Sequence, residues 1–217
     1  MFVVAVANLK GGTGKTTVAT HLAAAFAVAG HRTVLGDLDK LQVASAWARR
    51  RGAGLARVEA VTLDADEMVV PIGPGRTVID VPAGMKRKAL EVVVRAADAV
   101  VVPVQPGPFD EAGIERFLEV VREFKPVRKG RRPIAVVGNR VRARTSAAAR
   151  LDAYLAGLDH PAVTRLSDAQ AYLTAALTGQ TVFDAPPRRA NARQRDEWAP
   201  LVRFLDDLAL DTAHADL

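Results

Sequence analysis

Short apolar runs along this chain alternate with stretches in which apolar side chains recur every third or fourth position. Continuous apolar runs are typical of strands buried on both faces, and the longer period is typical of helices that bury one side. The predicted strands are 2–7, 32–38, 57–63, 76–80, 99–104 and 133–138. The alternation predicts an α/β fold of three layers, with a mostly parallel central sheet flanked by helices.

Helical spacing marks most of the segments between these strands. The apolar stripes are Val18, Leu22, Phe26 and Ala29; Leu90, Val93, Val94 and Ala97; Ile114, Phe117, Leu118 and Val121; Leu151, Tyr154, Leu155 and Leu158; and Trp198, Leu201, Val202, Leu205 and Leu208. Further helices are expected over about 42–51 and over 168–178, and Ser146 is expected to cap the helix that follows it. Glycine and proline predict a turn at 71–75 and a basic connecting loop at 125–132.

The helix expected near 42–51 leaves two interpretations open. Trp47 fits either core packing or a subunit interface. The three arginines 49–51 either interact favourably with the negative end of the helix dipole or contact DNA or a partner.

The clearest chemical pattern is the glycine-rich segment 8–17, which joins the first apolar run to the first helical stretch. Strand, glycine turn and helix form the context of a phosphate-binding loop, because the glycines let successive backbone N–H groups face one concavity and the helix N-terminus adds positive potential. Lys15 is expected at the β- and γ-phosphates and Thr16 at Mg²⁺. The nucleotide-binding residues predicted here are Gly11, Gly12, Thr13, Gly14, Lys15, Thr16 and Thr17. A glycine turn with two surface lysines is the alternative.

Three acids follow predicted strands at the edge where open α/β sheets bind their ligands. Asp37 and Asp39 end the second strand, and Asp80 ends the strand 76–80 before Pro82 and Gly84. An apolar strand that ends in Asp is the second nucleotide motif, and its buried carboxylate is the hard oxygen ligand that Mg²⁺ favours. The alternative for Asp37 and Asp39 is capping of the next helix.

Composition narrows the possible function classes. The 217 residues fit one domain, 1–217, and the lack of cysteine excludes disulfides, thiolate zinc sites and iron–sulfur clusters. The four histidines have no metal-ligand spacing, and the absence of a long apolar run or leader pattern leads us to expect a cytoplasmic protein. The net charge of +6 suits nucleic acid, although a GC-rich genome would give the same arginine-rich composition.

The phosphate loop also carries a second lysine, Lys10, ahead of the usual one. Lys-Gly-Gly-Thr-Gly-Lys-Thr-Thr at 10–17 resembles the deviant Walker A loop of the ParA/MinD family of P-loop ATPases. Asp-Val-Pro-Ala-Gly at 80–84, Pro-Gly-Pro-Phe-Asp at 106–110 and the segment 179–184 are similar to further motifs of that family. The resemblance covers nearly the whole chain and implies a P-loop NTPase fold, ATP and Mg²⁺ as cofactors, and hydrolysis of ATP to ADP and phosphate.

The family resemblance implies a role for several single residues. Lys10 would cross the interface of an ATP-dependent homodimer and reach the phosphates bound by the other subunit. Asp37 would lie near Mg²⁺, Asp39 would position the attacking water, and Lys10, Lys15 and Asp39 would together be catalytic. The segment of Asp80, Pro82 and Gly84 would sense the γ-phosphate as a switch, and Asn139 with Arg140 would bind adenine. Lys40 and Leu41 replace the family's Pro-Gln.

The same resemblance implies a partition or positioning ATPase. Its ATP-bound dimer would bind DNA non-specifically, and slow hydrolysis, stimulated by a ParB-like partner, would release it for plasmid partition, chromosome segregation or spacing of cargo over the nucleoid. The DNA contacts expected near the end of the chain are Arg188, Arg189, Arg193 and Arg195. Neither a membrane association nor an N-terminal helix-turn-helix extension is expected.

Two other classes remain open. A membrane-associated positioning ATPase of the MinD kind ends in a basic amphipathic helix, whereas the end of this chain, 206–217, is acidic. A P-loop biosynthetic enzyme, such as a dethiobiotin synthetase or a cobyrinate diamide synthase-like amidoligase, needs a second substrate pocket. The motifs outside the nucleotide site do not predict one.

Overall fold

The computed structural model describes residues 1–64, 75–184 and 189–215 of the chain. Most of the turn expected at 71–75 therefore lies outside the described residues, as does Arg188. The described part of the chain contains no helix that is both long and apolar enough to cross a membrane.

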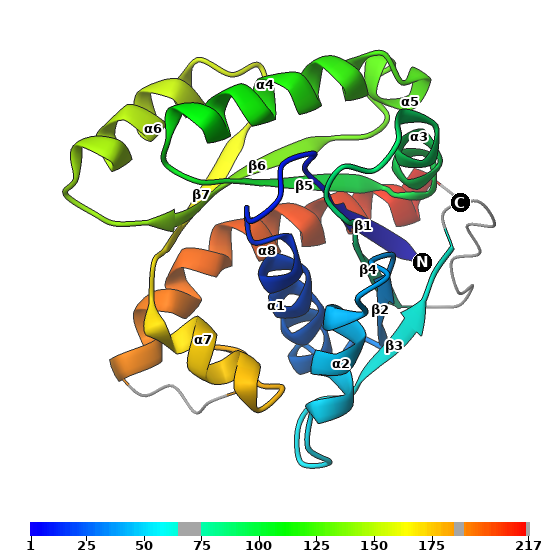
Figure 1. Ribbon diagram of the computed structural model, residues 1–217. Helices are drawn as coiled ribbons and strands as arrows, with labels where there is room; N and C mark the ends of the chain where they lie inside the picture. Colours follow the sequence, from blue (N-terminus) through cyan, green and yellow to red (C-terminus); the bar gives the residue numbers. More distant parts are fainter. Residues whose placement is uncertain (65–74, 185–188, 216–217) are drawn as a thin grey trace.

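Seven strands form one sheet in which every pairing is parallel (Figure 1). The order is β3-β2-β4-β1-β5-β6-β7, so the first strand lies at the centre. The strands are β1 (Phe2–Val6), β2 (Thr33–Asp37), β3 (Val58–Thr62), β4 (Arg76–Asp80), β5 (Ala99–Val104), β6 (Ile134–Val141) and β7 (Ala162–Ser167). All their carboxyl ends point to the same edge, which is where the predicted site residues gather.

Helices cover both faces of the sheet (Figure 1). One face carries α1 (Lys15–Val28), α2 (Val43–Arg50), α7 (Gln170–Leu177) and α8 (Arg189–Ala215). The other carries α3 (Arg87–Ala96), α4 (Pro108–Arg122) and α6 (Ser146–Ala156), with the short α5 (Lys125–Arg128) after α4. This arrangement confirms the predicted three-layer α/β class.

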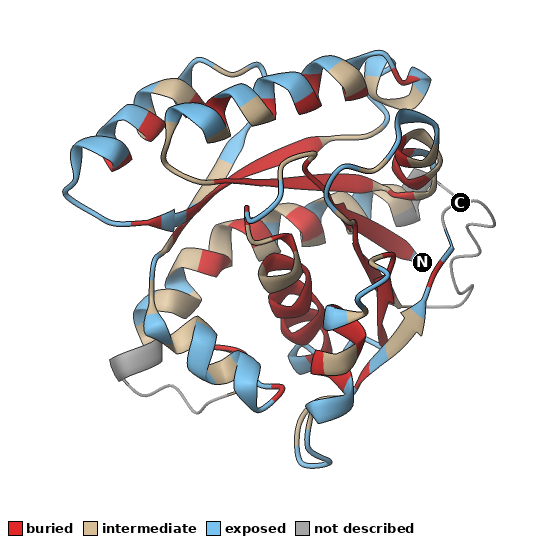
Figure 2. Cartoon of the chain, viewed as in Figure 1, coloured by how far each residue is buried: buried red, intermediate tan, exposed pale blue. Residues whose placement is uncertain are grey.

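The five inner strands of the sheet are buried because each face packs on its own apolar cluster, whereas the edge strands β3 and β7 are only partly buried (Figure 2). Val4 and Val6 belong to the cluster under α1, and Val3 and Ala5 belong to the opposite one, as the two-residue period of a strand requires. Helix α1 is itself buried at every residue from 18 to 27. Since it follows the glycine-rich loop directly, this packing fixes the loop against the core.

The structure differs from the sequence expectations at several boundaries. Thr145, not Ser146, is the N-cap of α6, because its side chain accepts the Ala148 amide at 3.2 Å. Residues 162–167 form an additional strand, and the helix after it starts at Gln170 instead of at 168. The basic segment 125–132 is not entirely loop, since proline at its second position starts the short helix α5.

Candidate nucleotide-binding site

The phosphate loop lies between β1 and α1 and is braced by groups from other strands. Gly14 has φ 90°, and a Cβ there would lie 2.2 Å from Asn139 Nδ2, so glycine is required twice over. Asn139 Nδ2 donates to the Thr13 carbonyl at 2.8 Å, and Gln105 Nε2 donates to the Gly12 carbonyl at 2.5 Å. No side chain caps α1, so its first N–H groups remain available to an anion.

Lys15 lies inside the loop, as the phosphate-binding pattern predicts. Its side chain is buried and its Nζ atom donates to the Lys10 carbonyl at 2.9 Å. Burial lowers the pKa of Lys15, and the carboxylates of Asp80 and Asp39 oppose that effect. A cation in this position can contact phosphate oxygens held by the loop.

Lys10 extends in a different direction. Its Nζ atom lies 2.6 Å from Asp110 Oδ2 at the start of α4, and its side chain remains about one third exposed. The side-chain carbons pack against Gly113, where a Cβ would lie 3.3 Å from Lys10 Cδ. In a single subunit, therefore, the Lys10 side chain is held by α4 of its own chain.

Two carboxylates stand side by side at the carboxyl edge. Asp37 and Asp80 are register partners at the ends of the neighbouring strands β2 and β4. Burial raises the pKa of Asp80 to about 7, Asp37 adds to this, and a hydrogen bond from Thr16 opposes it. The Asp80 Oδ1 atom is buried with no hydrogen-bond partner among the described residues.

These groups fit a magnesium ion. An orphaned carboxylate oxygen, a second carboxylate across the strand pair and the Thr16 hydroxyl are all hard oxygen donors. The residues that would hold Mg²⁺, directly or through its waters, are Thr16, Asp37 and Asp80.

Asp37 makes the capping contacts that the sequence offered as one of two roles. Its Oδ1 accepts the Asp39 amide at 3.0 Å and its Oδ2 accepts the Ser45 amide at 2.8 Å, in the first turn of α2. The carboxylate therefore caps α2 and still borders the predicted magnesium position. Asp39 is half-buried, and its Oδ1 accepts the Leu41 amide at 3.0 Å.

The segment after β4 contacts the phosphate loop directly. The Gly84 amide donates to the Leu9 carbonyl at 3.0 Å, and Gly84 has φ 66°. A Cβ at Gly11 would lie 3.8 Å from Ala83 Cβ. Pro82 and Gly84 thus border the phosphate loop, where a change at the γ-phosphate could reach them.

A cavity of about 720 Å³ opens beside the phosphate loop. Its lining includes Thr17 and Asn139 together with Tyr172, Leu173 and Ala176 of α7. Asn139 is buried and its Nδ2 is engaged by Thr13, while Arg140 is exposed with φ 52°. The cavity lies next to the phosphate site and is large enough to hold a base.

The basic residues near the start of α8 have different side-chain environments. Arg193 is exposed and donates to Glu197 Oε1 at 3.0 Å, one turn further along the helix. Arg195 turns inward, and its guanidinium donates to the carbonyls of Val182 and Phe183 at 2.7 and 2.5 Å. Arg189 begins the helix, but its side chain is outside the described part of the structure.

Two site residues carried no assigned role in the sequence reasoning. Gln105 braces the phosphate loop and Asp110 holds Lys10. Both follow β5 at the carboxyl edge, where polar side chains converge in a parallel sheet. Their position after a predicted strand could have identified both as candidate site residues from the sequence.

Trp47 and Arg51 are structural residues in this subunit. Trp47 is buried, with its indole Nε1 donating to the Gln180 carbonyl at 3.3 Å. Arg51 forms a buried ion pair with Asp184 at 2.7 Å. Of the two interpretations left open for it, Trp47 therefore serves core packing. Arg51 is an internal ion-pair partner, which neither interpretation of residues 49–51 included.

A parallel sheet covered on both faces, with a glycine-rich phosphate loop after its central strand, defines a P-loop nucleotide-binding protein. A family model described as the CobQ/CobB/MinD/ParA nucleotide-binding domain matches residues 4–182. The chain belongs to this family, as its deviant phosphate loop indicated.

The chain is also similar to individual proteins. It is 42% identical over 113 residues to the Maintenance of carboxysome distribution protein A of Gloeobacter kilaueensis. The aligned segment covers 51% of this chain and 52% of that protein. The chain thus matches about half the length of this curated relative.

Solved structures share the fold. The MinD cell division protein of Aquifex aeolicus has a TM-score of 0.73 at 15% identity, covering 96% of this chain and 97% of that one. The septum site-determining protein MinD of Pyrococcus horikoshii, complexed with Mg-ADP, has a TM-score of 0.70 at 16% identity, covering 96% and 97%.

Proposed function

We propose that this protein is an ATP-dependent positioning ATPase of the ParA type. Two subunits with bound ATP and Mg²⁺ would join face to face, bind DNA without sequence preference, and separate after slow hydrolysis. The observation that carries the proposal is the convergence of Lys15, Thr16 and Asp80 with the phosphate loop at one edge of the sheet. The matched family includes the ParA and MinD ATPases, which supports hydrolysis of ATP by this member.

Each residue of the site would contribute by position and charge. ATP supplies the phosphoryl group, and Mg²⁺ neutralises its charge when both are bound. The loop amides and Lys15 would hold the phosphates, so that Lys15 exchanges the Lys10 carbonyl for a phosphate oxygen. Asp39 is half-buried at the mouth of the site, where its carboxylate could orient the attacking water.

Lys10 links hydrolysis to assembly. Its ion pair with Asp110 leaves the Lys10 side chain about one third exposed, so the ammonium could exchange Asp110 for the phosphates of a facing subunit. Two such exchanges would close two sites at one interface. This supports an ATP-dependent homodimer as the DNA-binding form.

The relative named for carboxysome distribution supports a role in spacing cargo. For this chain, the cargo would be a plasmid, a chromosome or another body spaced over the nucleoid, with a ParB-like partner that stimulates hydrolysis. The basic start of α8 would contact DNA, with Arg189 and Arg193 as candidates. Arg195 would stabilise this part of the chain without contacting DNA, because its guanidinium donates to the carbonyls of Val182 and Phe183.

The test is binding to random-sequence duplex DNA without nucleotide, with ADP, and with ATP and Mg²⁺, across a salt series. Binding is expected only with ATP, and it should weaken steeply with salt because phosphate contacts release counterions. Arg193→Ala should lower the slope of log affinity against log salt by about one per subunit that contacts DNA.

Arg116→Ala is the matched control, since Arg116 forms a similar exposed ion pair with Glu119 at 3.0 Å on α4. Its salt slope should equal that of the wild type. Failure to bind DNA in any nucleotide state, despite ATP-driven dimers, would remove the nucleoid role. Binding to anionic vesicles instead would favour the membrane-associated class.

A further inference from the structure

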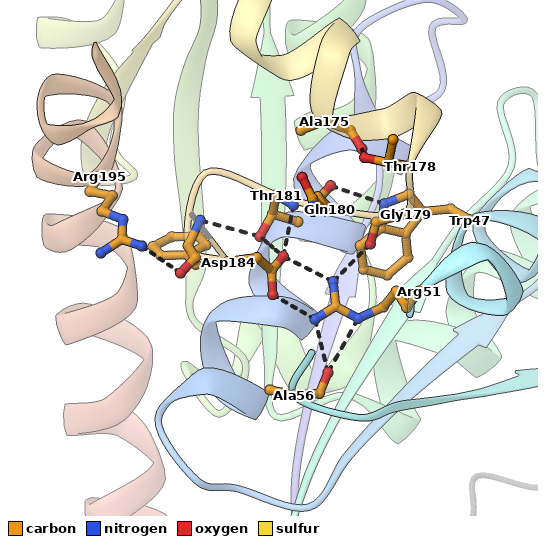
Figure 3. Close-up of polar contacts among 11 residues, drawn as sticks. Trp47, Arg51, Ala56, Ala175, Thr178, Gly179, Gln180, Thr181, Asp184 and Arg195 are labelled. Atoms are coloured by element: carbon orange, nitrogen blue, oxygen red, sulfur yellow. Dashed lines mark hydrogen bonds and ion pairs between the residues drawn. The ribbon is translucent and has the colours of Figure 1, made fainter. Parts of the chain in front are cut away.

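The C-terminal end of α2 is fastened to the segment that follows α7 (Figure 3). Arg51 and Asp184 form an ion pair with side chains only 4% and 1% exposed. The Arg51 guanidinium donates to both carboxylate oxygens, at 2.7 and 3.0 Å, and also to the carbonyls of Gly179 and Ala56. All three guanidinium nitrogens are therefore engaged by oxygens from two separate segments.

Neighbouring groups make the same connection. Trp47 donates to the Gln180 carbonyl, and Arg50 Nη2 donates to the Ala176 carbonyl at 3.4 Å. Gly179 has φ 69°, and a Cβ there would lie 2.6 Å from the backbone of Arg50 and Arg51. The two segments thus approach so closely that only glycine fits. We call Arg51, Asp184 and these backbone contacts the α2–α7 clamp.

The carboxylate of the clamp is held in its charged form. Burial alone would raise the pKa of Asp184, but hydrogen bonds from Arg51 and Thr181 outweigh burial and lower it. Asp184 Oδ2 also accepts the Thr181 amide and hydroxyl, both at 2.7 Å. The loop after α7 is therefore closed on itself and tied to α2 at the same carboxylate.

Helix α7 depends on this attachment because it buries little of its own surface. None of its residues is buried, and Leu173 and Leu177 are 59% and 77% exposed. Tyr172 packs partly against the core, and its hydroxyl accepts the Trp198 indole N–H at 3.2 Å. Apolar packing alone therefore gives α7 few contacts, and its C-terminal half is positioned chiefly through the clamp.

The same helix forms one wall of the cavity beside the phosphate loop. Tyr172, Leu173 and Ala176 line the cavity together with Thr17 and Asn139. Ala176 belongs to both features, since its carbonyl accepts Arg50 while the residue lines the cavity. A displacement of the clamp would change the width of the cavity without touching the phosphate loop.

We propose that Arg51 and Asp184 are positioning residues for the base of the bound nucleotide. They hold α7 in the position in which its residues and Asn139 line the same cavity, so that the base fits there. The proposal rests on the nucleotide-binding function and adds that affinity for the base depends on residues that do not touch it.

The experiment compares the dissociation constants of Mg-ATP and of magnesium tripolyphosphate, which has the phosphates but no base. In Arg51→Met, the constant for ATP should rise about tenfold, while that for tripolyphosphate should stay within about twofold of wild type. Arg51→Lys keeps the charge but loses the planar fork, so the same base-dependent loss should appear in a smaller degree. This second variant serves if Arg51→Met does not fold.

Arg76→Met is the matched control for general destabilisation. Arg76 is buried and pairs with Asp206 at 3.1 Å, linking β4 to α8 at the opposite edge of the sheet. It should leave both constants near wild type. An equal loss for both ligands in folded Arg51→Lys, or no loss for ATP, would overturn the proposal. A wild-type protein that binds neither ligand would overturn nucleotide binding itself.

Discussion

At the residue scale, the two acids at the end of β2, Asp37 and Asp39, differ in their hydrogen bonds and in how deeply they are buried. Both oxygens of Asp37 accept backbone amides, so its carboxylate is fixed between α2 and the predicted magnesium position. Asp39 is less buried, and its neighbours Lys40 and Leu41 are exposed. The more accessible acid is the better candidate for contact with an attacking water.

Asp39→Ala should therefore uncouple binding from turnover. ATP-dependent dimers should still form, because the phosphate loop, Lys15 and Asp80 remain, while ATP turnover falls by at least about a hundredfold. Phosphate release and sedimentation velocity measure the two properties separately. Lys15→Ala is the control, since it should abolish nucleotide binding and with it both properties. Full turnover in Asp39→Ala would contradict the assignment of the water.

At the element scale, α1 also contains a buried histidine, His21. His21 is fully buried on it, stacked on Trp198 of α8 with centroids 5.2 Å apart and edge-on to Tyr172 of α7. Its Nδ1–H donates to the Thr17 carbonyl at 2.9 Å, while Nε2 has no partner among the described residues. Burial lowers the pKa of His21 from 6.5 to about 4, so the folded protein keeps the imidazole neutral.

This burial predicts a pH dependence of stability. The unfolded chain protonates His21 below pH 6.5, whereas the folded protein does so only near pH 4. The free energy of unfolding should therefore fall by about 3 kcal/mol as the pH drops through this interval. Urea unfolding of wild type and His21→Leu at pH 7.5, 6, 5 and 4 measures it. Carboxylates contribute equally to both proteins, so equal slopes in the two would contradict the prediction.

The elements of the fold were largely predictable, and the contacts between them were not. Apolar runs predict most of the inner strands because parallel strands are buried on both faces, but the edge strand β7 is only partly buried and lacks such a run. The phosphate loop and Asp80 have local signatures. The Arg51–Asp184 pair joins residues 133 positions apart, and no local pattern in the sequence relates them.

At the scale of the whole molecule, the site occupies one open edge. The carboxyl ends of β1, β2 and β4 bring the phosphate loop, Asp37 and Asp80 together, and the Lys10 side chain remains about one third exposed beside them. Exposed Leu41 and Phe109 flank the same edge, at 80% and 82% exposure. An open polar site bordered by exposed apolar side chains suits closure by a second copy of the chain.

Lys10→Ala tests that closure because substitution of Lys10 and substitution of Lys15 should affect different properties. Lys15 and the loop amides remain in this variant, so a single subunit should bind Mg-ATP with wild-type affinity. The dimer should be lost, since each facing site would lack the cation that enters it from the other subunit, and a desolvated phosphate charge without a partner is costly. Nucleotide titration and sedimentation velocity with ATP distinguish the two properties.

Because Lys10 is held by Asp110 in the single subunit, its removal also leaves the Asp110 carboxylate, which is only 16% exposed, without its cation. Lys10→Ala/Asp110→Ala removes that secondary effect, and a wild-type dimer in this double variant would contradict the crossing of Lys10 between subunits.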